Sequence, residues 1–85
     1  ESGFGRYDIM LEPLNPVGND AIIMEFKVID PDTEKSLNVT VENALHQIQD
    51  RKYDTSLLAK GFQCDQIRSY GFAFQGKRVL IGKAD

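Results

Sequence analysis

The segment Met24-Glu25-Phe26-Lys27-Val28 carries the strongest structural signal in this chain. It places two charged side chains two residues apart inside the apolar run 21–29, whose Ile, Val and Phe content is typical of a central β-strand. Residues two apart in a strand point to one face, so Glu25 and Lys27 project together while their apolar neighbours enter the other face. Charges in a central strand are costly unless they are paired or used.

A second strand is predicted over 7–12, where Asp8 is likewise flanked by apolar residues and the run stops at Pro13. If the two strands pair antiparallel with Asp8 opposite Glu25, the charged residues share one face, while a slip by one residue would mix polar groups into the apolar face. We expect that wholly apolar face to be the core. Its pairs are Tyr7 with Phe26, Ile9 with Met24 and Leu11 with Ile22. The charged face then collects Arg6, Asp8, Glu25 and Lys27.

The rest of the chain predicts a helix and a closing hairpin. Apolar residues at 37, 41, 44, 45 and 48 have helical spacing, which predicts a helix over about 37–52 and a second helical stretch that ends at Gly61. Strands are expected over 67–74 and 77–83, joined by a tight turn at Gln75-Gly76. The order strand, strand, helix, strand, strand predicts one α/β domain over 1–85, with a mixed sheet crossed by the helix on one face.

Composition and charge narrow the classes of function. The 85 residues have a formal charge of −3, which argues against a strong sequence-independent grip on nucleic acid. No apolar run approaches the ~20 residues that a membrane-spanning helix needs, so no membrane partner is expected. The single Cys64 cannot form a disulfide within the chain, which is typical of a reducing compartment, and we expect a cytoplasmic location.

Asp8 and Glu25 are the candidate chemical groups. Two carboxylates on adjacent strands can supply oxygen ligands to a Mg²⁺ ion that takes its remaining ligands from water and phosphate. Lys27 beside them could act on a metal-bound water or neutralise charge that develops on the phosphate. The alternative is a partly buried ion-pair cluster without chemistry. For Arg6 we favour a pair with Glu25 over a contact with phosphate.

Four segments of the sequence resemble the PD-(D/E)XK nuclease superfamily, and more narrowly the bacterial nuclease-like domain that usually follows an AAA-ATPase-like domain in one polypeptide. The resemblance covers nearly the whole chain, and the combination of motifs at these spacings is specific, although Glu-x-Lys alone is a weak signal. The segments are 1–11, 22–28, 44–53 (Ala44-Leu45-His46-Gln47-Ile48 with Lys52-Tyr53) and Tyr70-Gly71-Phe72-Ala73-Phe74.

The resemblance implies a restriction-endonuclease-like fold with Asp8 as the motif aspartate and Glu25 and Lys27 as the Glu-x-Lys pair. Asp8 and Glu25 would hold Mg²⁺ or Mn²⁺, and Gln47 would be the helix glutamine that faces the site and assists orientation. Tyr53 matches the aromatic residue that follows it. For Gln47 and Tyr53 the alternatives are a solvated helix edge and a packing aromatic. Helical spacing puts Gln47 and Arg51 along one edge of the apolar stripe, near a sheet face.

The function implied is metal-dependent hydrolysis of nucleic-acid phosphodiester bonds, with DNA as the expected partner and an ATPase-like domain in the same polypeptide. The alternative is a non-catalytic interaction or regulatory module attached to that ATPase-like domain. The superfamily core begins with a helix and a strand, whereas only seven residues precede Asp8. We therefore expect 1–85 to be a C-terminal fragment of a longer protein, without the first core helix and inactive when isolated.

Overall fold

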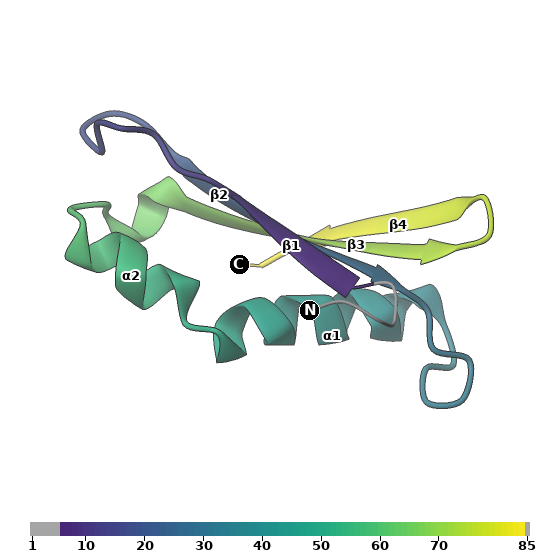
Figure 1. The fold of residues 1–85 in the computed structure, drawn as a ribbon. Helices are drawn as coiled ribbons and strands as arrows, with labels where there is room; N and C mark the ends of the chain where they lie inside the picture. Colours follow the sequence, from purple (N-terminus) through teal and green to yellow (C-terminus); the bar gives the residue numbers. More distant parts are fainter. Residues whose placement is uncertain (1–5, 85) are drawn as a thin grey trace.

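The computed structural model describes residues 6–84, so that Asp85 and residues 1–5 of the first resembling segment lie outside it. Within that range the elements are β1 (Arg6–Leu11), β2 (Ala21–Val28), α1 (Leu37–Asp50), α2 (Tyr53–Ala59), a 3₁₀ turn (Cys64–Gln66), β3 (Ile67–Gln75) and β4 (Arg78–Lys83). The strands form one sheet in the order β1-β2-β3-β4 (Figure 1). The β2–β3 pair is parallel and the two outer pairs are antiparallel. The predicted α/β class, mixed sheet and order of elements are confirmed.

The predicted register of the first two strands is also confirmed. Asp8 lies opposite Glu25, and the neighbouring pairs are Tyr7 with Phe26, Ile9 with Met24 and Leu11 with Ile22. Because side chains alternate across a strand, this register puts Arg6, Asp8, Glu25 and Lys27 on one face of the sheet.

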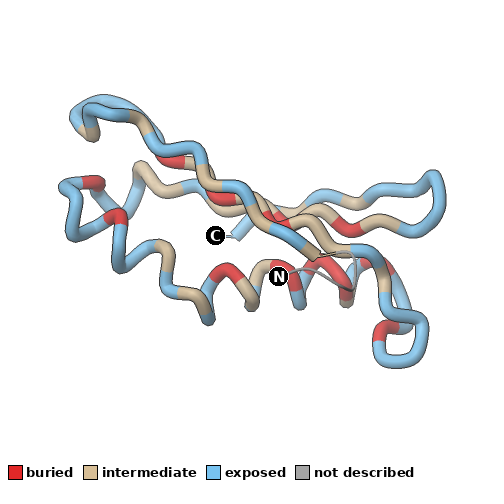
Figure 2. Tube along the Cα trace, viewed as in Figure 1, coloured by how far each residue is buried: buried red, intermediate tan, exposed pale blue. Residues whose placement is uncertain are grey.

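The prediction of which face forms the core was wrong. Both helices lie on the side of the sheet that carries the charged residues, and no helix in the described range covers the opposite side (Figure 1). There Tyr7, Ile9 and Leu11 are exposed, and exposed residues alternate with intermediate ones along β1 (Figure 2). Aromatic rings stack across this open face, with centroids 5.0 Å apart for Tyr7–Phe26 and 4.7 Å apart for Phe26–Phe72.

Small residues on the charged face explain why the helices cover that face. A Cβ atom on Gly71 would lie 3.1 Å from the Val41 carbonyl oxygen and 3.2 Å from the Ala44 Cβ, so α1 approaches the β3 backbone closely. Gly82 on β4 meets α1 in the same way, since a Cβ there would lie 2.5 Å from Val41 Cγ1. Glu25 is the register neighbour of Gly71 and is 0 % exposed. The close approach of α1 therefore buries the charged face.

The core sits between the sheet and the two helices. Most of the buried apolar residues in the range 6–84 form two clusters, one of Ala21, Ile23, Ile48, Leu57 and Phe62 and one of Leu37, Val41 and Ala73. The helix α1 begins after Ser36 and ends at Asp50, slightly before the predicted 52, because Lys52 adopts a left-handed conformation with φ 56°. None of the helices in residues 6–84 is long and apolar enough to cross a membrane.

Candidate functional site

The sheet brings Asp8 and Glu25 together as predicted, on adjacent strands and on the face that α1 covers. Asp8 is half-buried, while Glu25 is completely buried. A carboxylate with no exposure is expensive unless cations or hydrogen-bond donors compensate it. The arrangement therefore depends on the groups that surround the two acids.

Each of the two carboxylates is paired with an arginine. Arg51, just after α1, donates from Nη1 to Asp8 Oδ2 at 2.6 Å, and the Tyr53 hydroxyl donates to the same oxygen. Arg6 Nε lies 3.4 Å from Glu25 Oε2. The favoured pairing of Arg6 with Glu25 is thus confirmed, and Arg51 reaches the sheet face from the helix edge on which the sequence placed it.

The surroundings push the two acids in opposite directions. Burial alone would raise the pKa of Asp8, but the hydrogen bond from Tyr53 and the charge and hydrogen bond of Arg51 together lower it. Burial and the negative charge of Asp8 raise the pKa of Glu25, and this rise exceeds the opposing effects of Arg6 and Arg51. Asp8 is therefore the firmly ionised member of the pair, and Glu25 is the one that gains most from a further cation.

Glu25 Oε1 is the candidate contact point for a divalent cation. This oxygen is buried and has no hydrogen-bond partner within residues 6–84. No cluster of three or more His, Cys, Asp or Glu side chains suited to a metal occurs in the described range. Mg²⁺ commonly uses only one or two carboxylates and completes its shell with water and phosphate oxygens, so Asp8 and Glu25 suit it as a pair.

The expectation of one cluster with Lys27 beside the carboxylates needs correction. Lys27 shares their face, but its Nζ donates to Glu34 Oε2 at 2.8 Å, and no ion pair between Lys27 and Asp8 or Glu25 occurs in the described structure. Among residues 6–84, three separate ion pairs lie at this face: Arg6 with Glu25, Arg51 with Asp8, and Lys27 with Glu34.

Glu34 is a residue of this site that the sequence did not reveal. It lies between β2 and α1, is 3 % exposed, and receives four hydrogen bonds, from Lys27, Thr40, Asn43 and the backbone amide of Asp30. Burial would raise the pKa of Glu34, but these donors lower it to about 2. Lys27 and Glu34 are seven residues apart across a turn, and this spacing matches no sequence motif from which the pair could have been predicted.

The two helix residues implied by the resemblance behave differently. Tyr53 contacts Asp8 through its hydroxyl and so belongs to the site rather than to a packing role alone. Gln47 is half-buried on α1, and its side chain makes no hydrogen bond within the range that the structure describes. The orienting role of Gln47 stays a prediction.

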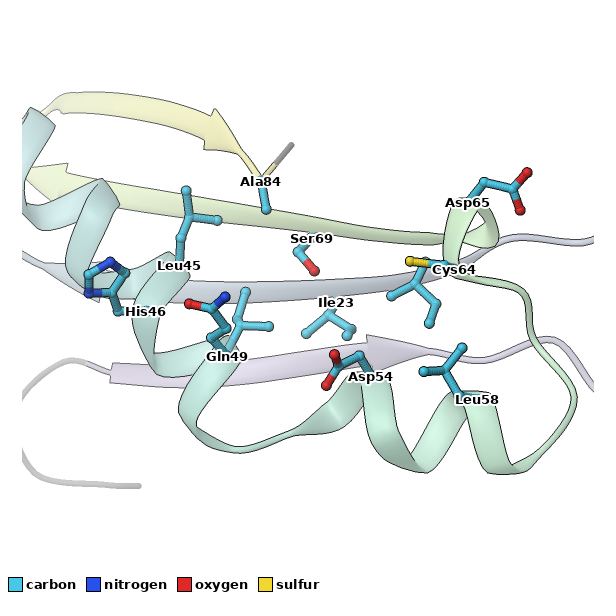
Figure 3. Close-up of a pocket in the computed structure, with 12 residues that line it drawn as sticks. Ile23, Leu45, His46, Gln49, Asp54, Leu58, Cys64, Asp65, Ser69 and Ala84 are labelled. Carbon is cyan, nitrogen blue, oxygen red and sulfur yellow. The ribbon is translucent and has the colours of Figure 1, made fainter.

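A cavity beside the two helices does not coincide with the carboxylate pair. It has a volume of about 720 Å³ and lies among α1, α2 and β3, with Ile23, Leu45 and Leu58 among its apolar walls (Figure 3). Asp54 and Asp65 also line it, so its charge disfavours a phosphate. Neither Asp8 nor Glu25 lines it. The cavity is therefore separate from the candidate carboxylate pair.

The mixed sheet with a paired-carboxylate site under its crossover helix defines an α/β protein with a restriction-endonuclease-like fold. The sequence model of the PD-(D/E)XK nuclease superfamily matches residues 1–84, and the chain belongs to this superfamily. A search of curated proteins and a search of solved structures each found no significant match.

Proposed function

We propose that the protein containing this chain hydrolyses phosphodiester bonds of DNA, and that this chain holds the divalent metal ion, Mg²⁺ or Mn²⁺, that the reaction uses. The observation that carries the proposal is the facing pair Asp8 and Glu25, in which a buried Glu25 oxygen has no donor among the described residues. Membership in a nuclease superfamily supports the same reading. The choice of DNA, and of an ATPase-like domain as partner in the same polypeptide, rests on the sequence resemblance alone.

Asp8 and Glu25 would hold the ion, because both are oxygen ligands on one sheet face and neither strand needs to move to bring them together. Bound there, the ion would polarise the phosphate and lower the pKa of a bound water. Glu25 has the stronger electrostatic reason to bind it, since burial raises the pKa of this carboxyl and a nearby divalent charge reverses that cost.

Three cationic side chains on the same face would receive the substrate. Arg6 and Arg51 neutralise the carboxylates in the structure, and their planar guanidinium groups also match phosphate oxygens. Lys27 supplies a compact positive charge two residues from Glu25, where it stabilises charge that grows on the phosphate. Gln47 orients substrate or water from α1.

A cleavage assay with Mg²⁺ or Mn²⁺ tests the proposal on single-stranded and duplex DNA, with RNA in parallel. We expect cleavage by the protein that contains this chain, and a loss of about 100-fold or more in Asp8→Asn and Glu25→Gln. Lys27→Ala should also lower the rate. Glu42→Gln is the matched control, because it neutralises an exposed acid on α1. Absence of cleavage by the intact protein, or full activity in the Glu25 and Lys27 variants, would sink the proposal.

A non-catalytic module is the second candidate, and the arginine pairing of both carboxylates favours it, because paired acids also serve as structure. A Mn²⁺ titration followed by NMR separates the two readings. Line broadening centred on Asp8, Glu25 and Lys27 supports the metal site. Uniform broadening, or none, supports the module.

A further inference from the structure

Glu34 is a buried carboxylate whose two oxygens are both fully engaged. Oε1 accepts from the Asp30 amide at 2.8 Å and from Thr40 Oγ1 at 3.0 Å. Oε2 accepts from Lys27 Nζ at 2.8 Å and from Asn43 Nδ2 at 2.6 Å. A carboxylate fixed by four donors in a buried place has little freedom to move, so it is a firm anchor for any cation that binds it.

Lys27 is the cation that this anchor holds. It follows Glu25 by two residues on β2, on the same face, which puts their Cα atoms roughly 6 to 7 Å apart. Its side chain is 15 % exposed, and an ammonium group has three N–H donors. The bond to Glu34 uses one donor, which leaves the others available for a phosphate. A free lysine side chain would instead sample many rotamers.

The donors to Glu34 also connect Lys27 to helix α1. Thr40 and Asn43 lie three residues apart in the first half of α1, so they share a face of the helix, and both point to Glu34. The Asp30 amide belongs to the turn that follows β2. The Glu34 side chain thus joins the end of β2, the start of α1 and the Lys27 ammonium in one hydrogen-bonded unit.

We propose that Glu34 is a positioning residue that holds the Lys27 ammonium at a fixed place on the sheet face that also carries Asp8 and Glu25. The inference rests on the proposed nuclease function, since it assigns Glu34 a role in that reaction through Lys27. Loss of the anchor releases Lys27 without removing its charge. The expected signature is a lower kcat with a nearly unchanged KM, because a misplaced charge weakens stabilisation of the transition state more than ground-state binding.

Steady-state cleavage kinetics of Glu34→Gln, Lys27→Met and the double variant test the inference. We expect Glu34→Gln to lower kcat by about ten- to a hundredfold. In the Lys27→Met background the Glu34→Gln change should cost no further kcat, since Glu34 acts only through Lys27. An unchanged kcat in Glu34→Gln, or losses that multiply in the double variant, overturns the inference.

Glu34→Asp keeps the test decisive if Glu34→Gln does not fold. This variant retains the charge but withdraws the carboxylate by one methylene group. If position matters, kcat falls although the charge is present; wild-type kcat would contradict a positioning role. Glu12→Gln is the matched control, because it removes the acid of the more exposed Lys60–Glu12 pair and should leave kcat unchanged.

NMR of the Lys27 side chain separates this inference from the proposed function. Order parameters of its ε-methylene group should be high in the wild type and should fall in Glu34→Asp, whether or not the protein cleaves DNA. Wild-type cleavage that falls in Lys27→Met but not in the Glu34 variants rejects only the inference. A protein with no cleavage and an ordered Lys27 rejects the proposed function and leaves Glu34 as a structural anchor.

Discussion

Against the effect of burial, the hydrogen bond from Tyr53 and the charge and hydrogen bond of Arg51 together lower the pKa of Asp8. The Arg51 guanidinium lies 2.6 Å from Asp8 Oδ2, a short charge-assisted hydrogen bond that favours the ionised carboxylate. The same oxygen is the one that faces Tyr53. A metal ion that binds Asp8 must share this oxygen with Arg51, displace it, or use the other oxygen, and in each case it meets the positive charge of the guanidinium.

Replacement of Arg51 should therefore strengthen metal binding. We expect Arg51→Met to lower the Mn²⁺ dissociation constant by about three- to tenfold, because it removes a competing cation from Asp8. Isothermal titration calorimetry measures this change. Arg68→Met is the control, since its pair with Asp20 is largely exposed and should leave the affinity unchanged. Weaker binding in Arg51→Met would show that Arg51 supports the metal site rather than competes with it.

The lowered pKa of Glu34 predicts how the free energy of unfolding depends on pH. Its pKa is about 2 in the folded chain against the ordinary value of 4.5, so its contribution is complete above pH 4.5 and is lost as pH falls toward 2. This difference between the folded and the ordinary pKa corresponds to at most about 3 kcal/mol in the free energy of unfolding. Urea unfolding as a function of pH should show a shallower acid limb in Glu34→Gln than in the wild type. Parallel acid limbs would contradict this assignment.

Glu25 affects the pH dependence of stability in the opposite direction to Glu34. Its pKa is raised in the folded chain, so its ionisation costs stability as pH rises through the ordinary value, and protonation relieves that cost at low pH. Glu25 therefore offsets part of the acid destabilisation that Glu34 causes.

At the scale of elements, the break between α1 and α2 places the two side chains that bind Asp8. In a continuous helix, residues two apart lie about 200° apart around the axis, so Arg51 and Tyr53 would face away from each other. Lys52 interrupts the helix with φ 56° and ψ 39°, and both neighbours then reach Asp8. The left-handed residue thus allows Arg51 and Tyr53, which would otherwise point apart, to donate hydrogen bonds to the same carboxylate.

Substitutions at Lys52 test this dependence. Lys52→Val should destabilise the fold by about 1 to 2 kcal/mol, because a β-branched residue resists positive φ, whereas Lys52→Gly tolerates it. Chemical denaturation measures the stability of both variants. Equal stability of the two would show that the turn does not depend on the left-handed conformation.

The element order and the register of β1 on β2 could be predicted from sequence because they follow from local patterns. A period of two fixes which residues share a face, and a one-residue slip would have mixed charged and apolar side chains. The helix over 37–50 followed from its apolar spacing. The end of that helix could not be predicted, since nothing at Lys52 marks a left-handed residue.

At the scale of the whole molecule, alternation does not say which face of a sheet is covered. The covered face carries Glu25 and Lys27, which argued against burial, and small residues such as Gly71 and Gly82, which permit a close helix. These small residues are the sequence feature from which the covered face could have been predicted. The approach of Asp8 and Glu25 was predictable from register, whereas the Lys27–Glu34 pair depends on the path of a turn and on two residues of α1.

The uncovered sheet face governs how the 85-residue chain behaves in concentrated salt. Its large exposed apolar side chains include Tyr7, Leu11, Val28, Val79 and Ile81. Sulfate strengthens the tendency of such a surface to leave water, so the folded chain should be retained strongly on a hydrophobic-interaction column. Ile81→Lys should shorten retention more than Val17→Lys, whose site lies in the loop 12–20. Equal shifts would contradict this expectation. A larger shift from Ile81→Lys would show that the uncovered sheet face sets the salt concentration at which the chain leaves solution.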